Sequence, residues 1–465
     1  MKETIVLYPA PSFAHLVSMV ELGKLILQHQ PHLSILILVP SMPSDHSTSA
    51  SSSYISDLSL TGIPMSFIYL PSLQVSVFDS VAMNALNVLD ALKTLSSSFT
   101  ILALVTSAPH ENLKTHIPTF CYFTSCASAL AFFLYLPTLH DQTNKSFKDL
   151  TETPLNFSGL PNFLSASSAP EPVLSREGPS YHFFLSFASS LLKSKGIIVN
   201  TFNFLEPRAV EPMKNGVCAP NDQTPPIFCI GPLITSARDH AISSSSSEDE
   251  TSNCIAWLDK QANRSVVFLC FGSKGVFSEA QIKEIAIGLE KSNHRFLWVV
   301  KSPLGLDTEP KLEELLPDGF LKRTKEKGLV VKSWAPQNAI LRHESVGGFV
   351  THCGWNSVLE AVSYGVPMVA WPLYAEQNLN SVIMVKEMKV AIPIISEEAA
   401  RDGSKLGLVV AEEVERRVKE LMEFEEGKIL RQRSLEMKAR AIAAWSSGGS
   451  SSTAFHDLVS SWKHG

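Results

Sequence analysis

Residues 347–360 read GGFVTHCGWNSVLE, and this stretch decides the fold class. It predicts a buried strand that ends at Thr351, then a tight turn and a helix. Gly354 permits the turn because glycine has no Cβ, and Asn356 or Ser357 is suited to cap the helix. A strand that leads through a short turn into a helix is the repeating unit of a parallel α/β sheet.

The same turn is a candidate anion site. The first N–H groups of a helix and the positive end of its dipole favour a negatively charged group such as a diphosphate, and His352 would add a donor. A structural interpretation competes with this one, because Ser357 and Glu360 have the spacing of a capping box, which needs no ligand. Spacing alone favours the two interpretations equally. Gly365 and Pro367 are predicted to end the helix.

Short β-branched runs alternate with longer segments of helical period along the chain, which is typical of parallel sheets wrapped by helices. The runs occur in both halves, so we expect an α/β protein with two sheets. The predicted strands are residues 5–7, 33–39, 101–105, 197–200, 266–271, 296–300, 329–331, 348–351 and 368–370.

The composition changes once, in residues 237–252, where five consecutive serines precede an acidic triplet at 248–250. We predict a solvated linker here, and we interpret the triplet as a charged loop instead of a metal site. Two facing α/β domains would leave a ligand cleft at the carboxyl ends of their strands. The predicted divisions are a first domain at 1–235, the linker at 236–253, a second domain at 254–442, and a last helix at 443–465 that packs back toward the first domain.

The whole-chain composition excludes several classes of function. The 465 residues are 45% hydrophobic and 18% charged, which is a globular composition, and the net charge of −6 argues against binding to nucleic acid. No run of about 20 apolar residues predicts a membrane span. Seven cysteines without a C-x-x-C pair fit a reducing compartment. We expect a cytoplasmic monomer that acts on small molecules.

Residues 334–377 resemble the plant secondary product glycosyltransferase box of family 1 glycosyltransferases. The match runs without a gap from Trp334 to Gln377, and residues 199–202, 231–232 and 271–273 are similar to the same family. The resemblance implies a GT-B fold of two facing Rossmann-like domains, with acceptor bound by the first and UDP-sugar by the second. It also implies an inverting glucosyltransferase that uses UDP-glucose and forms β-O-glucosides of flavonoid-like or chalcone-like phenols.

The resemblance further implies a set of donor contacts. Trp334 and Ala335 would contact the uracil, and Gln337 and Glu360 the ribose, so that Glu360 becomes a ligand instead of a capping residue. The diphosphate would be bound by His352, Asn356, Ser357 and Ser273, and the sugar by Trp355, Glu376 and Gln377. In the family, glutamine at the place of Gln377 goes with glucose donors. Because the chain has no Asp-x-Asp pair, we expect no metal, and no cofactor besides the co-substrate UDP-glucose.

His15 is the candidate general base. It follows the first predicted strand at the start of a helix, where the dipole disfavours the imidazolium and keeps the ring neutral. In the family, the matching histidine deprotonates the acceptor. The predicted acceptor pocket is aromatic, although most aromatic side chains of residues 120–135 are expected in the core. Its candidate residues are Phe13, Phe120, Tyr122 and Phe123.

The chain departs from its family after residues 103–105, where an aspartate normally orients the histidine. Residues 106–111 read TSAPHE, the following segment is short, and no aspartate matches. Three explanations are open. Glu111 or His110 replaces the aspartate; the histidine acts alone on an acidic phenol or a carbon nucleophile; or activity is weak or lost. Ser107 is interpreted mainly as an ordinary loop residue.

Two alternatives to O-glucosylation follow from this departure. One is C-glycosylation of the same acceptors, and the other is a nucleotide-sugar-binding protein that has lost turnover. A nicotinamide oxidoreductase is disfavoured, because no predicted strand leads into a G-x-G-x-x-G turn.

Overall fold

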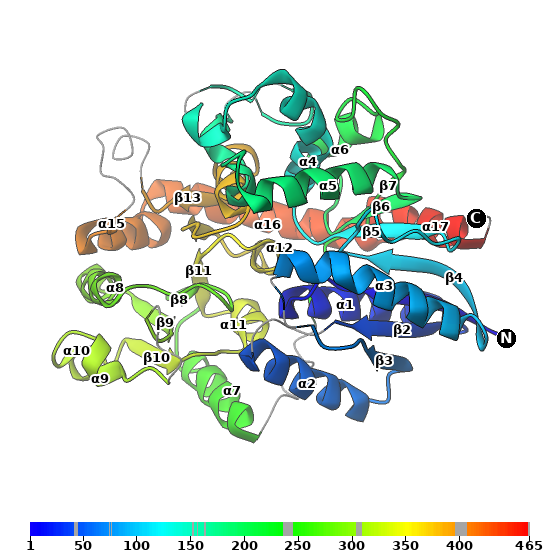
Figure 1. Ribbon diagram of the computed structural model, residues 1–465. Helices are drawn as coiled ribbons and strands as arrows, with labels where there is room; N and C mark the ends of the chain where they lie inside the picture. Colours follow the sequence, from blue (N-terminus) through cyan, green and yellow to red (C-terminus); the bar gives the residue numbers. More distant parts are fainter. Residues whose placement is uncertain are drawn as a thin grey trace. The chain divides into compact units, whose positions relative to one another are not determined.

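The computed structural model describes residues 1–40, 45–73, 75, 77–150, 153–155, 157–161, 164–235, 245–303, 309–395 and 407–463. The chain divides into two compact units. The N-terminal unit is Met1–Thr235 with Ala443–Gly465, and the C-terminal unit is Ser236–Ile442. Each unit contains one sheet flanked by helices (Figure 1).

The N-terminal sheet has seven strands in the order β3-β2-β1-β4-β5-β6-β7, and all neighbours are parallel. In the centre, Val6 of β1 is in register with Leu36 of β2 and with Leu104 of β4. The strands are β1 (Lys2–Tyr8), β2 (Ser34–Val39), β3 (Met65–Tyr69), β4 (Phe99–Thr106), β5 (Thr119–Phe123), β6 (Gly196–Val199) and β7 (Ile227–Cys229).

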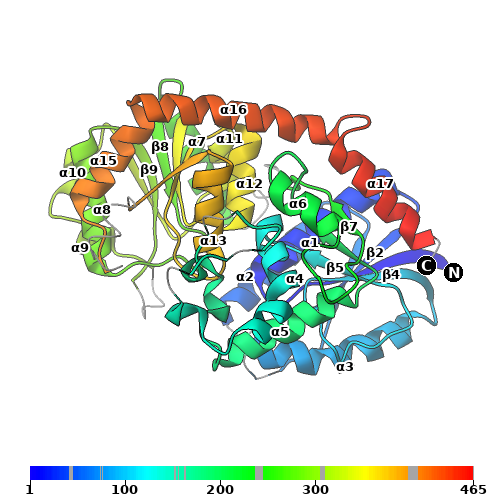
Figure 2. The ribbon, with the colours of Figure 1, turned by 90° about the horizontal axis from the view of Figure 1, so that it is seen from above.

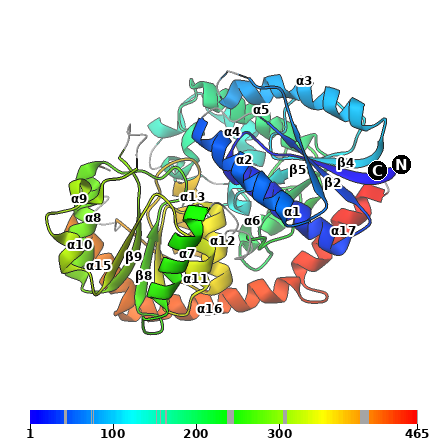
Figure 3. The ribbon, with the colours of Figure 1, turned by 90° about the horizontal axis from the view of Figure 1, so that it is seen from below.

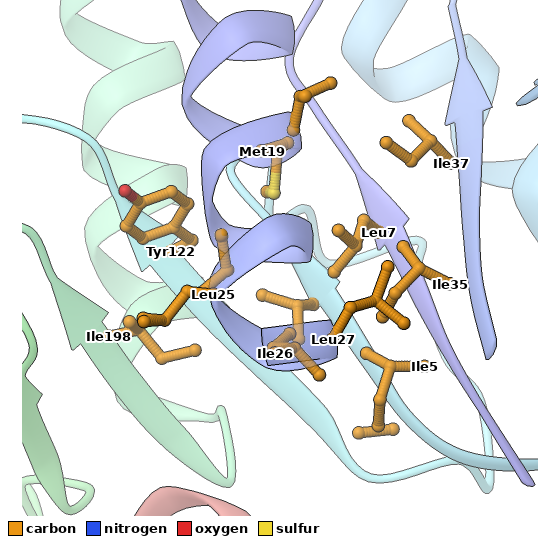
Figure 4. Close-up of a cluster of buried hydrophobic side chains, with 14 of the residues drawn as sticks. Ile5, Leu7, Met19, Leu25, Ile26, Leu27, Ile35, Ile37, Tyr122 and Ile198 are labelled. Atoms are coloured by element: carbon orange, nitrogen blue, oxygen red, sulfur yellow. The ribbon is translucent and has the colours of Figure 1, made fainter. Parts of the chain in front are cut away.

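Alternating side chains of these strands enter two apolar layers, because neighbouring residues of a strand point to opposite faces. One layer joins Ile5 and Leu7 to side chains of α1 (Phe13–His29), as Figure 4 shows, and the other joins Val6 and Tyr8 to α3 (Val77–Leu95). Figure 3 shows α1 on one side of this sheet and α3 on the other. The strands are therefore covered on both faces, which is why β1 and β2 lack the alternation of a solvent-facing strand.

The C-terminal sheet has six strands in the order β10-β9-β8-β11-β12-β13, again all parallel. Figure 2 shows its strands between α8 and α15 on one face and α11 and α12 on the other. The strands are β8 (Val266–Cys270), β9 (Arg295–Val300), β10 (Gly328–Lys332), β11 (Val346–Thr351), β12 (Met368–Ala370) and β13 (Ala391–Pro393). The flanking helices are α8 (Glu279–Ser292), α11 (Gln337–Arg342), α12 (Trp355–Tyr364) and α15 (Ala411–Met422).

All nine predicted strands are confirmed, and four strands were missed: β3, β5, β7 and β13. The missed strands have only three to five residues. The remaining helices of ten or more residues are α2 (Asp45–Leu60), α4 (Ala127–Gln142), α5 (Pro179–Leu192), α7 (Ser245–Leu258), α16 (Glu425–Trp445) and α17 (Ser450–Lys463), and α6 (Pro207–Lys214) and α13 (Gln377–Val382) are shorter. None of the described helices has the length and apolar character needed to cross a membrane.

The predicted linker is partly helical. Residues 236–244 lie outside the described residues, but α7 begins at Ser245 and contains the acidic triplet 248–250. The prediction of a charged loop at the triplet is therefore wrong.

The end of the chain belongs to the core of the N-terminal unit. Phe455, Leu458, Val459 and Trp462 of α17 are buried in the same layer as α1, and the Trp462 ring meets that of Phe120 edge-on at a centroid distance of 6.4 Å. The apolar layer between the N-terminal sheet and α1 is thus completed by residues more than 200 positions beyond β7.

A buried carboxylate fixes the start of α4. Glu206 has no exposed surface, and it accepts hydrogen bonds from the N–H groups of Ala127 and Ser128 at 2.8 and 2.9 Å. The hydroxyls of Ser128 and Thr201 donate to the same carboxylate at 2.9 and 2.8 Å. Glu206 therefore satisfies the first turn of α4 and connects it to the loop after β6.

Glu206→Ala should lower the free energy of unfolding by about 4 kcal/mol, because it leaves buried N–H donors without an acceptor. Urea unfolding followed by circular dichroism measures this loss. Glu211→Ala, at an exposed position of α6, is the matched control and should change stability by less than about 0.5 kcal/mol. Equal stability of the two variants would contradict the role of Glu206.

Candidate functional site

In both sheets the strand order reverses between two central strands, β1 and β4 in the N-terminal unit and β8 and β11 in the C-terminal unit. Loops that leave the carboxyl ends of such strands diverge, which makes room for a ligand. His15 and Ser107 follow β1 and β4, and Gly272 and His352 follow β8 and β11. The predicted histidine of each unit therefore lies at its reversal point.

His352 lies between two glycine backbones. A Cβ at Gly272 or at Gly354 would overlap His352 Nε2, so both positions require glycine. Only 6% of His352 is exposed, and its buried Nδ1 has no hydrogen-bond partner among the described residues. Burial, together with the charge of Lys301, lowers the pKa of His352 to about 4. The ring is therefore neutral at neutral pH, and the hydrogen-bonding capacity of its buried Nδ1 is unused among the described residues.

The turn between β11 and α12 is fixed by its backbone. Cys353, and not Gly354, has the left-handed conformation, with a φ of 65°. The Cys353 N–H donates to Thr351 Oγ1 at 3.3 Å, and its carbonyl accepts from Asn380 Nδ2 at 2.9 Å. Gly354 is needed for the close approach of His352, so the predicted glycine turn is displaced by one residue.

The helix α12 begins earlier than the sequence suggested. Its N-cap is Gly354, with extended backbone angles and no side-chain cap. Asn356 and Ser357 already lie in the first turn, so the prediction that either caps the helix is wrong, and so is the capping box of Ser357 and Glu360. The predicted end is confirmed, because Gly365 is the C-cap with a φ of 73°. With no acidic residue in its first turn, this helix start is suited to an anion.

Lys301 directly follows β9 and was not singled out from the sequence. Its Nζ donates to the carbonyl oxygens of Gly272 and Ser273, the latter at 2.6 Å. Burial lowers the pKa of Lys301. The ammonium group therefore fixes the turn after β8 and places a cation near His352.

Gln337, Ser357 and Glu360 form one hydrogen-bonded group. Gln337 Nε2 donates to Ser357 Oγ at 2.9 Å and to Glu360 Oε2 at 2.7 Å. Ser357 and Glu360 are each 6% exposed, and burial raises the pKa of Glu360 to about 7. This carboxyl is suited to accept hydrogen bonds from a polyol, because two directional acceptors are held in place.

The remaining donor candidates also follow strands of the C-terminal sheet. Trp334, which is half-buried, and buried Ala335 lie in the turn from β10 to α11. Trp355 is buried at the start of α12, Glu376 is half-buried, and Ser273 is exposed after β8.

Gln377 has a structural role in the described geometry. Its Oε1 accepts from the N–H groups of Leu373 and Tyr374 at 2.9 and 3.0 Å. The side chain thus fixes the turn that carries Glu376, and a contact with a sugar stays a prediction.

His15 lies in the first turn of α1, as predicted. Its Nδ1 is 2.9 Å from Ser107 Oγ and 3.4 Å from Thr124 Oγ1. Ser107 Oγ also accepts from the Ala10 N–H at 2.9 Å. Ser107 is therefore not an ordinary loop residue. The signal in the sequence was its position, since Ser107 and Thr124 each follow the end of a strand closely.

The suggested substitutes for the missing aspartate lie elsewhere. Glu111 and His110 line a pocket of about 240 Å³ with Thr119, the first residue of β5, and Lys193 beyond α5. The loop from β4 to β5 contains no helix and carries both residues toward the amino end of β5. Among the described contacts, Ser107 lies against Nδ1 of His15, which is the place that was suggested for Glu111 or His110.

Three of the four predicted acceptor residues are buried. Phe120 and Tyr122 are each 1% exposed and belong to the layer of α1 and α17, because alternate residues of β5 face that side. Phe123, which is 7% exposed, points to the opposite face, where its ring lies 6.0 Å from Phe133 and 6.4 Å from half-buried Phe187. Phe13 is partly buried against Tyr54. Within the described residues, no three His, Cys, Asp or Glu side chains are grouped to hold a metal.

Comparison with known proteins gives consistent matches. Residues 234–402 match the family model of UDP-glucuronosyl and UDP-glucosyl transferases. The chain is 44% identical to an anthocyanidin 5,3-O-glucosyltransferase of a Rosa hybrid cultivar, over 99% of each chain. It is 45% identical to a phloretin 2'-O-glucosyltransferase of Malus domestica, over 99% of this chain and 100% of that one. The structure of Phytolacca americana UGT2 with UDP-2-fluoro-glucose and pterostilbene has a TM-score of 0.84 and 35% identity, over 99% of this chain and 100% of that one.

The raised pKa of Glu360 predicts a pH dependence of stability. Because the folded-state value of about 7 exceeds the ordinary value of 4.5, the folded state binds more protons between these pH values. The carboxyl therefore stabilises the fold below pH 4.5, and this contribution is lost as the pH rises through 7. Between pH 5 and pH 8, the free energy of unfolding of wild type, measured with urea, should fall by about 2 to 3 kcal/mol more than that of Glu360→Gln. Glu326→Gln, at an exposed position, should behave as wild type, and a Glu360→Gln variant with unchanged pH dependence would refute the shift.

Proposed function

The chain belongs to the plant family 1 UDP-glycosyltransferases and is a UDP-dependent hexosyltransferase of the GT-B fold, and from this premise we propose that it transfers glucose to small phenolic acceptors. In the proposed reaction, the acceptor hydroxyl attacks the anomeric carbon of UDP-glucose. The bond to the diphosphate breaks with inversion, and the product is a β-O-glucoside.

Three features of the C-terminal unit support diphosphate binding. The start of α12 offers N–H groups and a favourable dipole. His352 has a buried nitrogen whose hydrogen-bonding capacity is unused among the described residues. Lys301 supplies a positive charge that is held by two carbonyls after β8. Together these groups would stabilise the charge that develops on the leaving diphosphate, and Asn356, Ser357 and Ser273 would add donors.

The nucleoside and the sugar have separate proposed contacts. Glu360, oriented by Gln337, would accept from the ribose hydroxyls. Trp334 would stack on the uracil, while the backbone of Ala335 would pair with its edge. Trp355, Glu376 and Gln377 would contact the glucose.

The observation that carries the acceptor proposal is the position of His15 beside Thr124, directly after the aromatic side chain of Phe123. His15 would take the proton of the acceptor hydroxyl. Half-buried Phe184 and Phe187 of α5, the latter packed beside buried Phe123, offer aromatic surface suited to a planar ring. The acceptors named for two relatives, anthocyanidins and phloretin, are phenols and support the same class.

The proposal is tested by incubating the purified protein with UDP-glucose and a panel of flavonoids, chalcones and simple phenols. We expect a mass gain of one hexose by mass spectrometry, and a rate that falls about 10²–10⁴-fold in His15→Ala, because a general base is lost. The product should release glucose in hot acid. An acid-stable product would indicate C-glycosylation instead of O-glycosylation. The absence of product with every acceptor would refute the proposed activity.

Lys301→Met should weaken UDP binding about tenfold, which corresponds to the ~1.5 kcal/mol of a hydrogen bond to a charged group. Calorimetric titration with UDP measures this change. Lys283→Met, at an exposed position of α8, is the matched control and should bind as wild type. Unchanged UDP affinity in Lys301→Met would show that the cation does not act on the diphosphate.

A further inference from the structure

We propose that Ser107 is the positioning residue of His15, and that this neutral hydroxyl restricts the enzyme to acceptors with an acidic attacking group. The inference rests on the proposed function, because it assumes that His15 is the base. It goes further by naming which phenols the enzyme can use.

Ser107 Oγ is placed to accept the Nδ1 proton of His15. To take a proton on Nε2, His15 must carry its own proton on Nδ1 and donate it. Ser107 Oγ lies 2.9 Å from Nδ1 and also accepts from the Ala10 N–H, so its two lone pairs can accept from both N–H groups. In this tautomer Nε2 is the basic nitrogen. Thr124 Oγ1, at 3.4 Å from Nδ1, adds a second and weaker hydroxyl contact.

Ser107 is itself held in place. It is 7% exposed, its N–H donates to the Tyr8 carbonyl at 3.1 Å, and its Oγ accepts from Ala10. These contacts connect it to β1 and to the loop after β1, immediately before α1. The hydroxyl is therefore fixed by backbone groups on the strand that leads into the histidine helix. A fixed acceptor orients the ring at little entropic cost.

A hydroxyl orients the ring but does not balance its charge. During transfer the acceptor proton moves to Nε2, the acceptor oxygen forms a bond to the anomeric carbon, and the diphosphate leaves with the bonding electrons. His15 then carries a positive charge. A carboxylate beside Nδ1 would stabilise that charge and raise the proton affinity of the ring, whereas a serine hydroxyl has no net charge.

The consequence concerns the acceptor. A base whose orienting partner is neutral gains no proton affinity from that partner, and by Brønsted behaviour a weaker base removes a proton less efficiently from a less acidic group. The chain should therefore favour phenols acidified by electron-withdrawing groups, and it should discriminate against simple alkylphenols with a pKa near that of tyrosine, about 10. Aliphatic alcohols should be poor acceptors.

The test compares kcat and KM for a series of substituted phenols, from a nitrophenol to an alkylphenol, in wild type and four variants. Ser107→Ala should lower kcat about tenfold or more, with little change in the KM for UDP-glucose, because the ring loses its orienting acceptor. Ser107→Thr keeps the oxygen and should restore most of kcat. Ser107→Asp should raise the activity on the alkylphenol relative to the nitrophenol about tenfold, since a carboxylate increases the proton affinity of His15.

Ser98→Ala is the matched control. Ser98 is an exposed serine just before the other end of β4, so this variant should keep the wild-type kcat and acceptor preference. Circular dichroism melting of each variant separates loss of fold from loss of orientation. A purely structural role of Ser107 would lower stability without changing the dependence on phenol acidity.

The inference is overturned if Ser107→Ala has the wild-type kcat, or if Ser107→Asp leaves the ratio of alkylphenol to nitrophenol activity unchanged. Failure of the proposed function gives different results. In that case wild type forms no glucoside with any phenol, or His15→Ala is as active as wild type.

Discussion

The parallel pairing of strands is the constraint on which both candidate sites depend. Parallel strands place all their carboxyl ends at one edge of a sheet, and the order reverses between β1 and β4 and between β8 and β11. The residues that follow these four strands therefore diverge around an open position. His15 and Ser107 meet at one such position, and Gly272 and His352 at the other. Because of this topology, candidate functional side chains that are far apart in the sequence become neighbours.

The two histidines are used in different ways within their units. His352 is enclosed by glycine backbones and kept neutral by burial, so it is suited to donate a hydrogen bond and unsuited to take a proton. His15 is half-buried and contacts hydroxyl groups, so its ring stays accessible to proton exchange. In the C-terminal unit, Lys301 supplies a positive charge and donates to two carbonyl oxygens after β8. In the proposed function, anion binding and proton transfer would therefore use different groups.

The sequence predicted what depends on long patterns and missed what depends on tertiary contacts. Nine strands and the end of α12 at Gly365 follow from periodicity and from glycine chemistry. The start of α12 does not, because it lies at Gly354, whose close approach to His352 is a tertiary contact that the sequence pattern does not show. Ser107 looks like any loop serine until β4 is paired with β1 and brings it to His15. For the same reason, aromatic composition did not show that buried Tyr122 and Phe123 point to opposite faces, since the direction of β5 side chains is set by the sheet.

The closing of the N-terminal core by α17 has a consequence for synthesis. A chain emerges from the ribosome in sequence order, and domains generally fold as they emerge. Here the layer over α1 lacks Phe455, Leu458, Val459 and Trp462 until α17 is translated. The C-terminal unit, which ends at Ile442, has emerged in sequence before that point. The second unit in the sequence therefore has all its residues first, and the nascent N-terminal unit exposes an apolar stripe until α17 follows.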